Sequence, residues 1–166
     1  MSAPTEQELK DLAEELGACM KDKGIKLATA ESCTGGWIAK IITDIPGSSE
    51  WFTGSVVCYS NESKVSLLGV QKSTLTDLGA VSGDTVTEMV DGLFDHTNAD
   101  VAVGVSGIAG PDGGTDDKPV GLVWLSWGRR GKPVYAKPFN FEGDREEVRK
   151  KSIAQSLNNL LDLLVC

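Results

Sequence analysis

The sequence predicts an α/β fold: a three-layer α/β/α sandwich with a mostly parallel mixed sheet. Three observations support this prediction. Helical and strand-like patterns alternate over the first two thirds of the chain, as in parallel strands joined by helices. The apolar run DVAVGVSG, residues 100–107, is typical of a strand buried on both faces. Two more strand patterns, joined by the turn at residues 128–132, predict an antiparallel hairpin before a closing helix.

Each element follows from a local pattern. The first helix begins at a capping box of Thr5 with Glu8, and Gly24 ends it. No linker, repeat or low-complexity tract interrupts the chain, so we expect one domain over residues 1–166. The strands are expected at residues 25–31, 53–60, 100–107, 120–127 and 133–141. The other helices are expected at residues 34–43 and 61–68, after Ser82, and after Asp144 with Glu147.

The net charge of −8, from 16 basic and 24 acidic residues, argues against a nucleic-acid partner. It does not exclude a small phosphorylated ligand, which needs only one or two cations and some backbone amides. No apolar run is long enough to predict a membrane helix, so no membrane partner is expected. The polar N-terminus MSAPTEQELK is unlike a secretion signal. We therefore expect a cytoplasmic protein.

The four cysteines and the single histidine offer no metal-binding pattern. Cys19, Cys33, Cys58 and Cys166 form no C-x-x-C pair, and their irregular placing suits free thiols in a reducing compartment. His96 is the only histidine, so a Ser-His-Asp relay has almost nothing to be built from. We expect His96 at a helix end without a catalytic role.

The segment TAESCTGG, residues 29–36, is the first candidate site. Ser32 would lie between a strand and a helix, where free amides and the helix dipole could stabilise an oxyanion. The two glycines would let a ligand approach the backbone closely. Taken locally, the pattern favours a plain helix cap at Ser32 or Thr34. Cys33 is a rival nucleophile, although a lone cysteine is more often inert packing.

The segment YSNESK, residues 59–64, is the second candidate. A serine nucleophile needs a base, and without histidines a lysine is the plausible substitute. Lys64 would have to be partly desolvated so that its pKa falls from about 10.4 toward the working range. Tyr59 could relay a proton or hold the lysine in place, and Asn61 could cap the short helix that follows. The alternatives are a solvated lysine on a helix face and a tyrosine that only packs.

Two later segments could bind an anion. The glycine-rich SGIAGPDGG, residues 106–114, could form a nest of backbone amides or be only a flexible surface loop. Arg145 and Arg149 lie one turn apart at the start of the last helix, so either could bind a phosphate or remain on a solvated surface. TAESCTGG, YSNESK and SGIAGPDGG each follow an expected strand. Because ligands of open α/β sheets bind at the carboxyl ends of strands, we expect these three segments to converge on one site.

Six segments in this order resemble the CinA C-terminal domain family. They are TAESCTGG, PGSSEWF, YSNESK, GAVS, SGIAGPDGG with KPVG, and GDR. The resemblance extends from about residue 12 to the last helix. It implies a compact α/β domain that hydrolyses the carboxamide of nicotinamide mononucleotide to nicotinic acid mononucleotide and ammonia, in pyridine-nucleotide salvage. It implies no cofactor and no metal, and a small nucleotide as the partner. Because small domains of this type commonly associate, we also expect a homo-oligomer.

The resemblance implies a role for each matching residue. Ser32 would be the nucleophile, Lys64 the base and Tyr59 its helper. The GIAGP loop and the arginine of GDR would bind the ribose and the phosphate. The substrate-binding residues expected from these motifs are Thr34, Gly35, Gly36, Asn61, Ser106, Gly107, Ala109, Gly110 and Arg145.

Two positions depart from the family pattern. Gly54-Ser55 stands where the family usually has two glycines, and Ser106 stands where a threonine is usual. The first adds a side chain near the expected pocket, whereas the second keeps the hydroxyl. Two alternatives to the amidase stay open at this point. One is a non-catalytic nucleotide-binding module in competence or DNA-damage responses, and the other is a hydrolase of a different amide, such as a small lactam.

Overall fold

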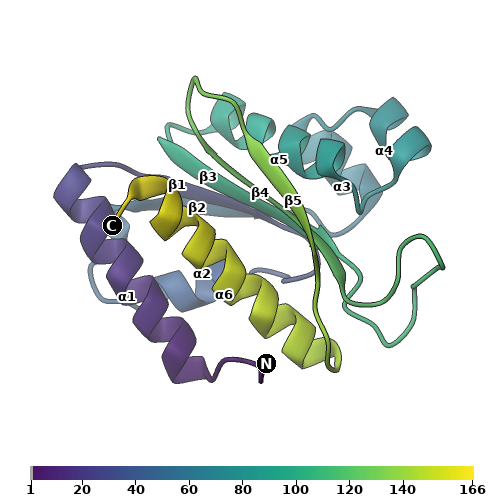
Figure 1. Ribbon diagram of the computed structural model, residues 1–166. Helices are drawn as coiled ribbons and strands as arrows, with labels where there is room; N and C mark the ends of the chain where they lie inside the picture. Colours follow the sequence, from purple (N-terminus) through teal and green to yellow (C-terminus); the bar gives the residue numbers. More distant parts are fainter. Residues whose placement is uncertain (1) are drawn as a thin grey trace.

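A five-stranded mixed sheet forms the centre of the molecule (Figure 1). The computed structural model describes residues 2–166. The strands are β1 (Leu27–Glu31), β2 (Phe52–Val57), β3 (Val101–Gly107), β4 (Leu122–Arg129) and β5 (Tyr135–Asn140). Their spatial order is β2-β1-β3-β4-β5. β1 is parallel to β2 and β3, whereas β4 is antiparallel to β3 and β5, so the sheet is mixed as expected.

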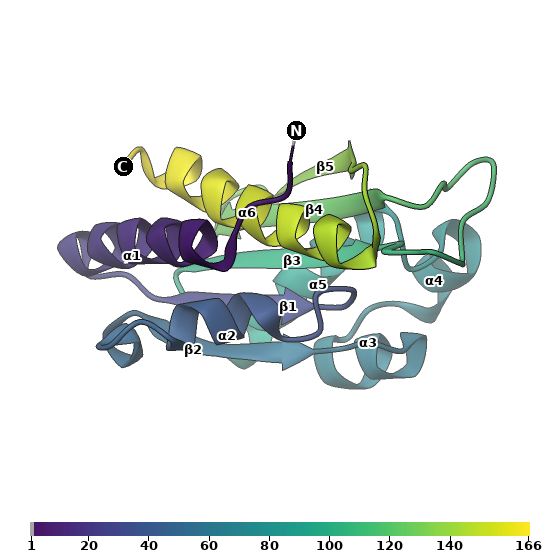
Figure 2. The same ribbon diagram turned by 90° about the horizontal axis from the view of Figure 1, so that it is seen from below.

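Helices cover both faces of the sheet (Figure 2). They are α1 (Glu6–Lys23), α2 (Trp37–Thr43), α3 (Asn61–Leu68), α4 (Lys72–Leu78), α5 (Gly83–His96) and α6 (Arg145–Leu164), with a short 3-10 turn η1 (Ser48–Glu50). α1, α2 and α6 share one face, and α5 covers the other with α3 and α4 packed against it. The predicted three-layer α/β/α sandwich is confirmed. No helix among residues 2–166 has the length and apolar character needed to cross a membrane.

The alternation of side chains along β1 explains the two cores. Leu27 is buried against α1, α2 and α6, whereas Ala28 and Ala30 are buried against α5 on the opposite face. On that second face α3 packs closely on α5, because Gly92 has no side chain. A Cβ at Gly92 would clash with the carbonyl oxygen of Leu68 at the end of α3. This close packing holds α3 against α5, and the chain enters α3 directly from the carboxyl end of β2.

Most helix ends agree with the sequence patterns. The capping boxes at Thr5 and Asp144, the cap at Ser82 and the left-handed Gly24 are all confirmed. The expected cap at Asn61 is wrong. Ser60 caps α3 instead, because it has the extended backbone of a cap and its Oγ accepts from the Ser63 N–H at 3.1 Å.

Two helical segments differ from the prediction. α2 begins at Trp37 rather than at residue 34, because residues 32–36 form a turn in which Gly35 and Gly36 have positive φ. α4 was not predicted from the sequence. None of its residues is buried, so it has no apolar stripe that a sequence pattern could reveal.

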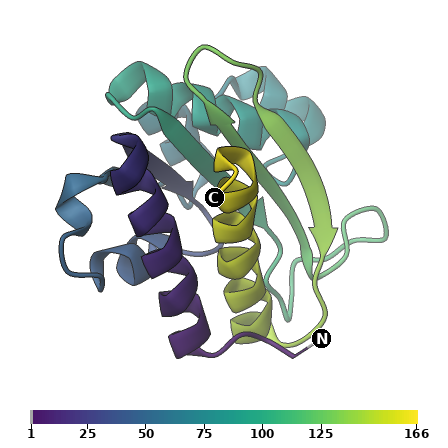
Figure 3. The same ribbon diagram turned by 60° about the vertical axis from the view of Figure 1, so that its left-hand side comes forward.

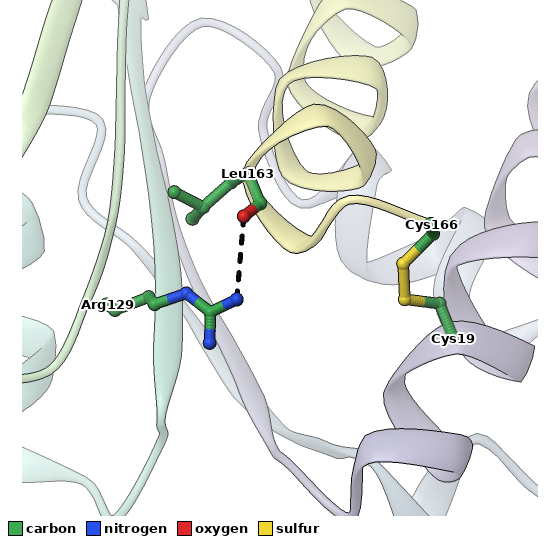
Figure 4. The surroundings of a disulfide bond; sticks show 4 residues. All are labelled: Cys19, Arg129, Leu163 and Cys166. Atoms are coloured by element: carbon green, nitrogen blue, oxygen red, sulfur yellow. Dashed lines mark hydrogen bonds between the residues drawn. A yellow bond between two sulfur atoms is a disulfide. The ribbon is translucent and has the colours of Figure 1, made fainter.

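α1 and α6 lie side by side, and the chain's C-terminus returns to the end of α1 (Figure 3). A disulfide there joins Cys19 to Cys166 across 147 residues of sequence, with the two Cα atoms 6.0 Å apart (Figure 4). The expectation of free thiols was therefore wrong for this pair, because sequence spacing does not show which distant segments meet. Cys33 and Cys58 are free and buried.

Candidate active site

Ser32 and Lys64 are in direct contact at the carboxyl end of the sheet. Lys64 Nζ lies 2.9 Å from Ser32 Oγ, 2.9 Å from the carbonyl oxygen of Cys58 and 3.1 Å from that of Tyr59. Both side chains are buried, with 7% of Ser32 and 1% of Lys64 exposed. The two residues that the sequence placed 32 positions apart thus form one hydrogen-bonded pair.

The sheet directs Ser32 toward Lys64. Ser32 continues the β1 ladder, because its N–H donates to the Val105 carbonyl at 3.0 Å. Side chains alternate along a strand, so Glu31 and Ser32 point to opposite faces. Glu31 faces α2, and Ser32 faces α3, which carries Lys64 in its first turns. The capping residue Ser60 lies only three residues after the end of β2, so α3 begins close to β2 and keeps Lys64 near this edge of the sheet.

The surroundings of Lys64 favour its neutral amine. Burial lowers the pKa of the Lys64 ammonium from its ordinary value of 10.5, and the nearby Cys58 and Cys33 oppose that effect only in part. None of the salt bridges among residues 2–166 involves Lys64. A neutral amine has two N–H groups and one lone pair. If the two carbonyls accept its N–H groups, the lone pair faces Ser32 Oγ, which is the geometry of a general base.

A cavity of about 210 Å³ opens onto this pair. It brings together the three candidate segments and the start of α6. The residues that line it are Ser32, Cys33, Tyr59, Lys64, Ala80, Val81, Ser106, Gly107, Ala109 and Arg145. Ala80 and Val81 belong to the GAVS segment between α4 and α5. The sequence assigned no role to Ala80 and Val81, and their only signal was their place among the six family-like motifs.

Four of the expected substrate-binding residues lie away from the cavity lining. Thr34 is fully buried, and its hydroxyl donates to the Glu31 carboxylate at 2.7 Å. Asn61 lines a separate groove between α3 and α4. Gly35 and Gly36 form the turn that leads into α2. A fifth, Gly110, touches the site only through its carbonyl, which accepts from Arg145 at 2.7 Å.

The two arginines of α6 have different surroundings. Arg145 lines the cavity, and its Nη2 lies 3.3 Å from the Tyr59 hydroxyl. Arg149 donates instead to the carbonyls of Cys33 and Thr34, each at 3.0 Å, and its guanidinium lies over the Trp37 ring. Arg145 is therefore the cation available to a ligand, whereas Arg149 holds the turn after Ser32.

Tyr59 contributes differently from the expectation. Tyr59 is 64% exposed, and its hydroxyl contacts Arg145 rather than Lys64. Its carbonyl is the group that binds Lys64. Cys33, the rival nucleophile, is 6% exposed, and burial raises the pKa of its thiol to about 12. Since the thiolate is the reactive form, Cys33 is an inert residue of the cavity wall.

The expected oxyanion donors at the start of α2 are already engaged. The N–H groups of Ile38 and Ala39 donate to the Glu31 carboxylate at 2.9 and 3.0 Å. They cannot also stabilise charge at Ser32, so this part of the expectation is wrong. The N–H of Cys33, the residue after the serine, has no backbone acceptor among residues 2–166. In α/β-hydrolases, a donor at that position serves as half of the oxyanion hole.

The fold and the site define an α/β protein with a buried serine–lysine pair at the carboxyl end of its parallel strands. No group of three or more His, Cys, Asp or Glu side chains in the described part of the chain could hold a metal ion. Residues 9–164 match the model of the CinA C-terminal domain. The chain belongs to the CinA C-terminal domain family.

Several relatives match almost the full chain. It is 48% identical over 157 residues to the nicotinamide-nucleotide amidohydrolase PncC of Escherichia coli (strain K12), with 94% of each chain covered. It is 52% identical over 158 residues to PncC of Enterobacter agglomerans, covering 95% of this chain and 96% of that protein. The crystal structure of the competence/damage inducible protein CihA from Agrobacterium tumefaciens has a TM-score of 0.92 and 38% identity, with 98% of both chains covered.

Proposed function

We propose that this protein is an amidohydrolase that converts nicotinamide mononucleotide to nicotinic acid mononucleotide and ammonia, with Ser32 as nucleophile and Lys64 as base. The PncC relatives, named for activity on a nicotinamide nucleotide, support the substrate. One observation carries the mechanism: Lys64 Nζ lies 2.9 Å from Ser32 Oγ inside a cavity. A base within that reach can take the serine proton directly.

The first half of the proposed reaction forms an acyl-enzyme. Neutral Lys64 takes the proton of Ser32 Oγ while that oxygen attacks the carboxamide carbon, and the carbonyl electrons move onto oxygen. The Cys33 N–H stabilises the resulting oxyanion. When the intermediate collapses, the C–N bond breaks and the Lys64 ammonium returns its proton to the leaving nitrogen. Ammonia departs, and an ester to Ser32 remains.

The second half releases the acid. A water molecule gives a proton to neutral Lys64 as its oxygen attacks the ester carbon. Collapse of the new tetrahedral intermediate breaks the bond to Ser32 Oγ, which regains a proton from Lys64. The free carboxylic acid then loses its proton to solvent. One water is consumed for each amide hydrolysed, and no oxidant or metal enters the balance.

The size and charge of the site fit the substrate. At about 210 Å³ the cavity is below the range of roughly 300–1,000 Å³ that whole ligands usually occupy, so it would take the carboxamide-bearing ring. The ribose and phosphate would then extend past Ser106 and Gly107 toward Arg145 at the rim. A guanidinium binds a phosphate well. One such cation at the site is enough to bind a single phosphate, even though the whole chain has a net charge of −8.

Incubating the purified chain with nicotinamide mononucleotide and measuring ammonia tests this proposal. Stoichiometric formation of nicotinic acid mononucleotide is expected, with its loss in Ser32→Ala. Calorimetric binding of the mononucleotide without turnover would instead indicate a non-catalytic nucleotide-binding module. Release of ammonia from other amides, but not from nicotinamide mononucleotide, would show that the protein is an amidase with a different substrate. The cytoplasmic location and the homo-oligomer stay predictions, and light scattering on the purified chain measures the second.

A further inference from the structure

Glu31 carries a buried carboxylate directly beside Ser32, and the proposed reaction does not use it. Its side chain is 0% exposed, and none of the salt bridges among residues 2–166 includes it. Burying an unpaired carboxylate is costly unless hydrogen bonds satisfy it. The surroundings of Glu31 must therefore offset the cost of burying its carboxylate at the candidate active site.

Hydrogen bonds from the turn and from α2 satisfy this carboxylate. Thr34 Oγ1 donates to Oε1 at 2.7 Å, the Ile38 N–H to Oε1 at 2.9 Å and the Ala39 N–H to Oε2 at 3.0 Å. On the strand side, the hydroxyls of Ser55 and Thr29 lie 3.2 and 3.5 Å from Oε2. The negative charge also lies at the positive end of the α2 dipole, which is favourable.

These bonds close the turn that holds the nucleophile. The Glu31 carbonyl accepts from the Cys58 N–H at 2.9 Å, and the Ser32 N–H donates to Val105 at 3.0 Å, so the sheet holds the chain before the turn. The Glu31 carboxylate holds Thr34 and the start of α2, which follow the turn. Residues 32–36 are thus fixed at both ends, and two of them are glycines with positive φ.

We infer that Glu31 is a positioning residue, whose carboxylate fixes the turn at residues 32–36 so that Ser32 Oγ faces Lys64. The inference rests on the proposed role of Ser32. By occupying the Ile38 and Ala39 amides, Glu31 also keeps these two donors from an oxyanion at Ser32. Glutamine would not replace it, because one of its two terminal atoms is itself a donor and would face donors.

Substitutions of Thr34 test the inference without removing the buried charge. Thr34→Val keeps the shape of the side chain but removes the hydroxyl that donates to Glu31, whereas Thr34→Ser restores a hydroxyl. We expect Thr34→Val and Glu31→Gln to lower kcat by about tenfold or more with KM within about twofold, because small misplacements of reacting groups can cost about 10²-fold. Thr34→Ser should recover kcat to within about threefold of the parent.

Thr97→Val is the matched control. It removes a hydroxyl that donates to the Leu93 carbonyl at 2.7 Å, the length of the Thr34 bond, and accepts from the Ala99 N–H at 3.2 Å, at the end of α5 away from the cavity. It should lower the stability of the fold while kcat stays unchanged. If Thr34→Val and Glu31→Gln kept the parent's kcat, or if Thr97→Val lost as much kcat as Thr34→Val, the positioning role would be refuted.

A second readout separates this inference from the proposed function. Labelling of Ser32 by a fluorophosphonate, followed by intact mass, does not require the natural substrate. If the parent did not hydrolyse nicotinamide mononucleotide but its Ser32 were labelled, only the proposed substrate would fail. Labelling slower by about tenfold in Thr34→Val would then support the positioning role. Equal labelling rates in the two, or no labelling of Ser32 in the parent, would overturn it.

Discussion

Lys64 Nζ lies 2.9 Å from Ser32 Oγ, and the remaining two contacts of that amine are backbone carbonyls rather than carboxylates. A carboxylate would stabilise the ammonium form and leave no lone pair for the serine. Carbonyls bind the N–H groups of either form. The pair therefore lacks a carboxylate that would hold the charge on the lysine, and burial, the largest influence on its pKa, favours the neutral amine.

Removing the Ser32 hydroxyl should abolish turnover while leaving the fold intact. We expect Ser32→Ala to lower kcat by at least about 10³-fold, because no other described side chain in the cavity hydrogen-bonds to Lys64 Nζ. Ammonia release from nicotinamide mononucleotide measures the effect. Ser126→Ala, which removes another buried hydroxyl from the same sheet, should retain activity. Parent-level ammonia release by Ser32→Ala would exclude the covalent mechanism.

The reaction should accelerate with rising pH. If Lys64 is the proposed neutral base, the lowering of its pKa by burial predicts that kcat/KM rises to a plateau with an inflection below the ordinary value of 10.5. Lys64→Arg keeps a cation that cannot lose its proton, so it should lower kcat by about 10²-fold or more at every pH. An inflection in the parent profile that persisted in residual Lys64→Arg activity would assign the titration to another group.

The same pKa shift should affect stability. The folded-state pKa of Lys64 is lowered, so between that value and 10.5 the unfolded chain binds more protons than the folded chain. The contribution of Lys64 to the free energy of unfolding should therefore rise with pH in that window and become constant below the folded pKa. Urea unfolding of the parent and of Lys64→Met across alkaline pH measures it, since the Met variant lacks this slope. Parallel curves would contradict the shift.

Substitutions of Arg145 and Arg149 should affect different kinetic constants. Arg145→Ala should raise KM by about tenfold or more with little change in kcat, because phosphate binding is mostly uniform binding. Arg149→Ala should instead lower kcat, since Arg149 holds the carbonyls of Cys33 and Thr34. Nicotinamide riboside, which has no phosphate, provides the control and should show little dependence on Arg145. The reverse pattern would place Arg145 at the reacting end.

Cys33 should resist alkylation despite lying in the wall of the cavity. Cys33 is 6% exposed, and burial raises the pKa of its thiol to about 12, so the thiolate is scarce at pH 8. Mass spectrometry of the native chain after iodoacetamide treatment should find Cys33 unmodified, and Cys33→Ala should keep kcat within about threefold. Rapid alkylation with loss of activity would restore Cys33 as a candidate nucleophile.

The sequence predicted the layers of the fold better than the contacts of the site. The capping boxes and apolar stripes are local signals, so the ends of α1, α5 and α6 were readable. α4 has no buried residue and was missed. Ala80 and Val81 are small apolar residues in a connection, and no local chemistry distinguishes them from packing. The Cys19–Cys166 disulfide depends on two distant ends meeting, which spacing cannot reveal.

Ser32 and Lys64 were both identified from the sequence, but only through the order of six motifs, because each segment alone fits a helix cap or a surface lysine. By itself the sequence determined which residue types follow which strands. The tertiary structure decided that β2 lies beside β1, which brings Lys64 to Ser32. It also decided that Glu31 occupies the α2 amides. Strand order and the facing of side chains depend on packing across the whole sheet, whereas sequence patterns act over only a few residues.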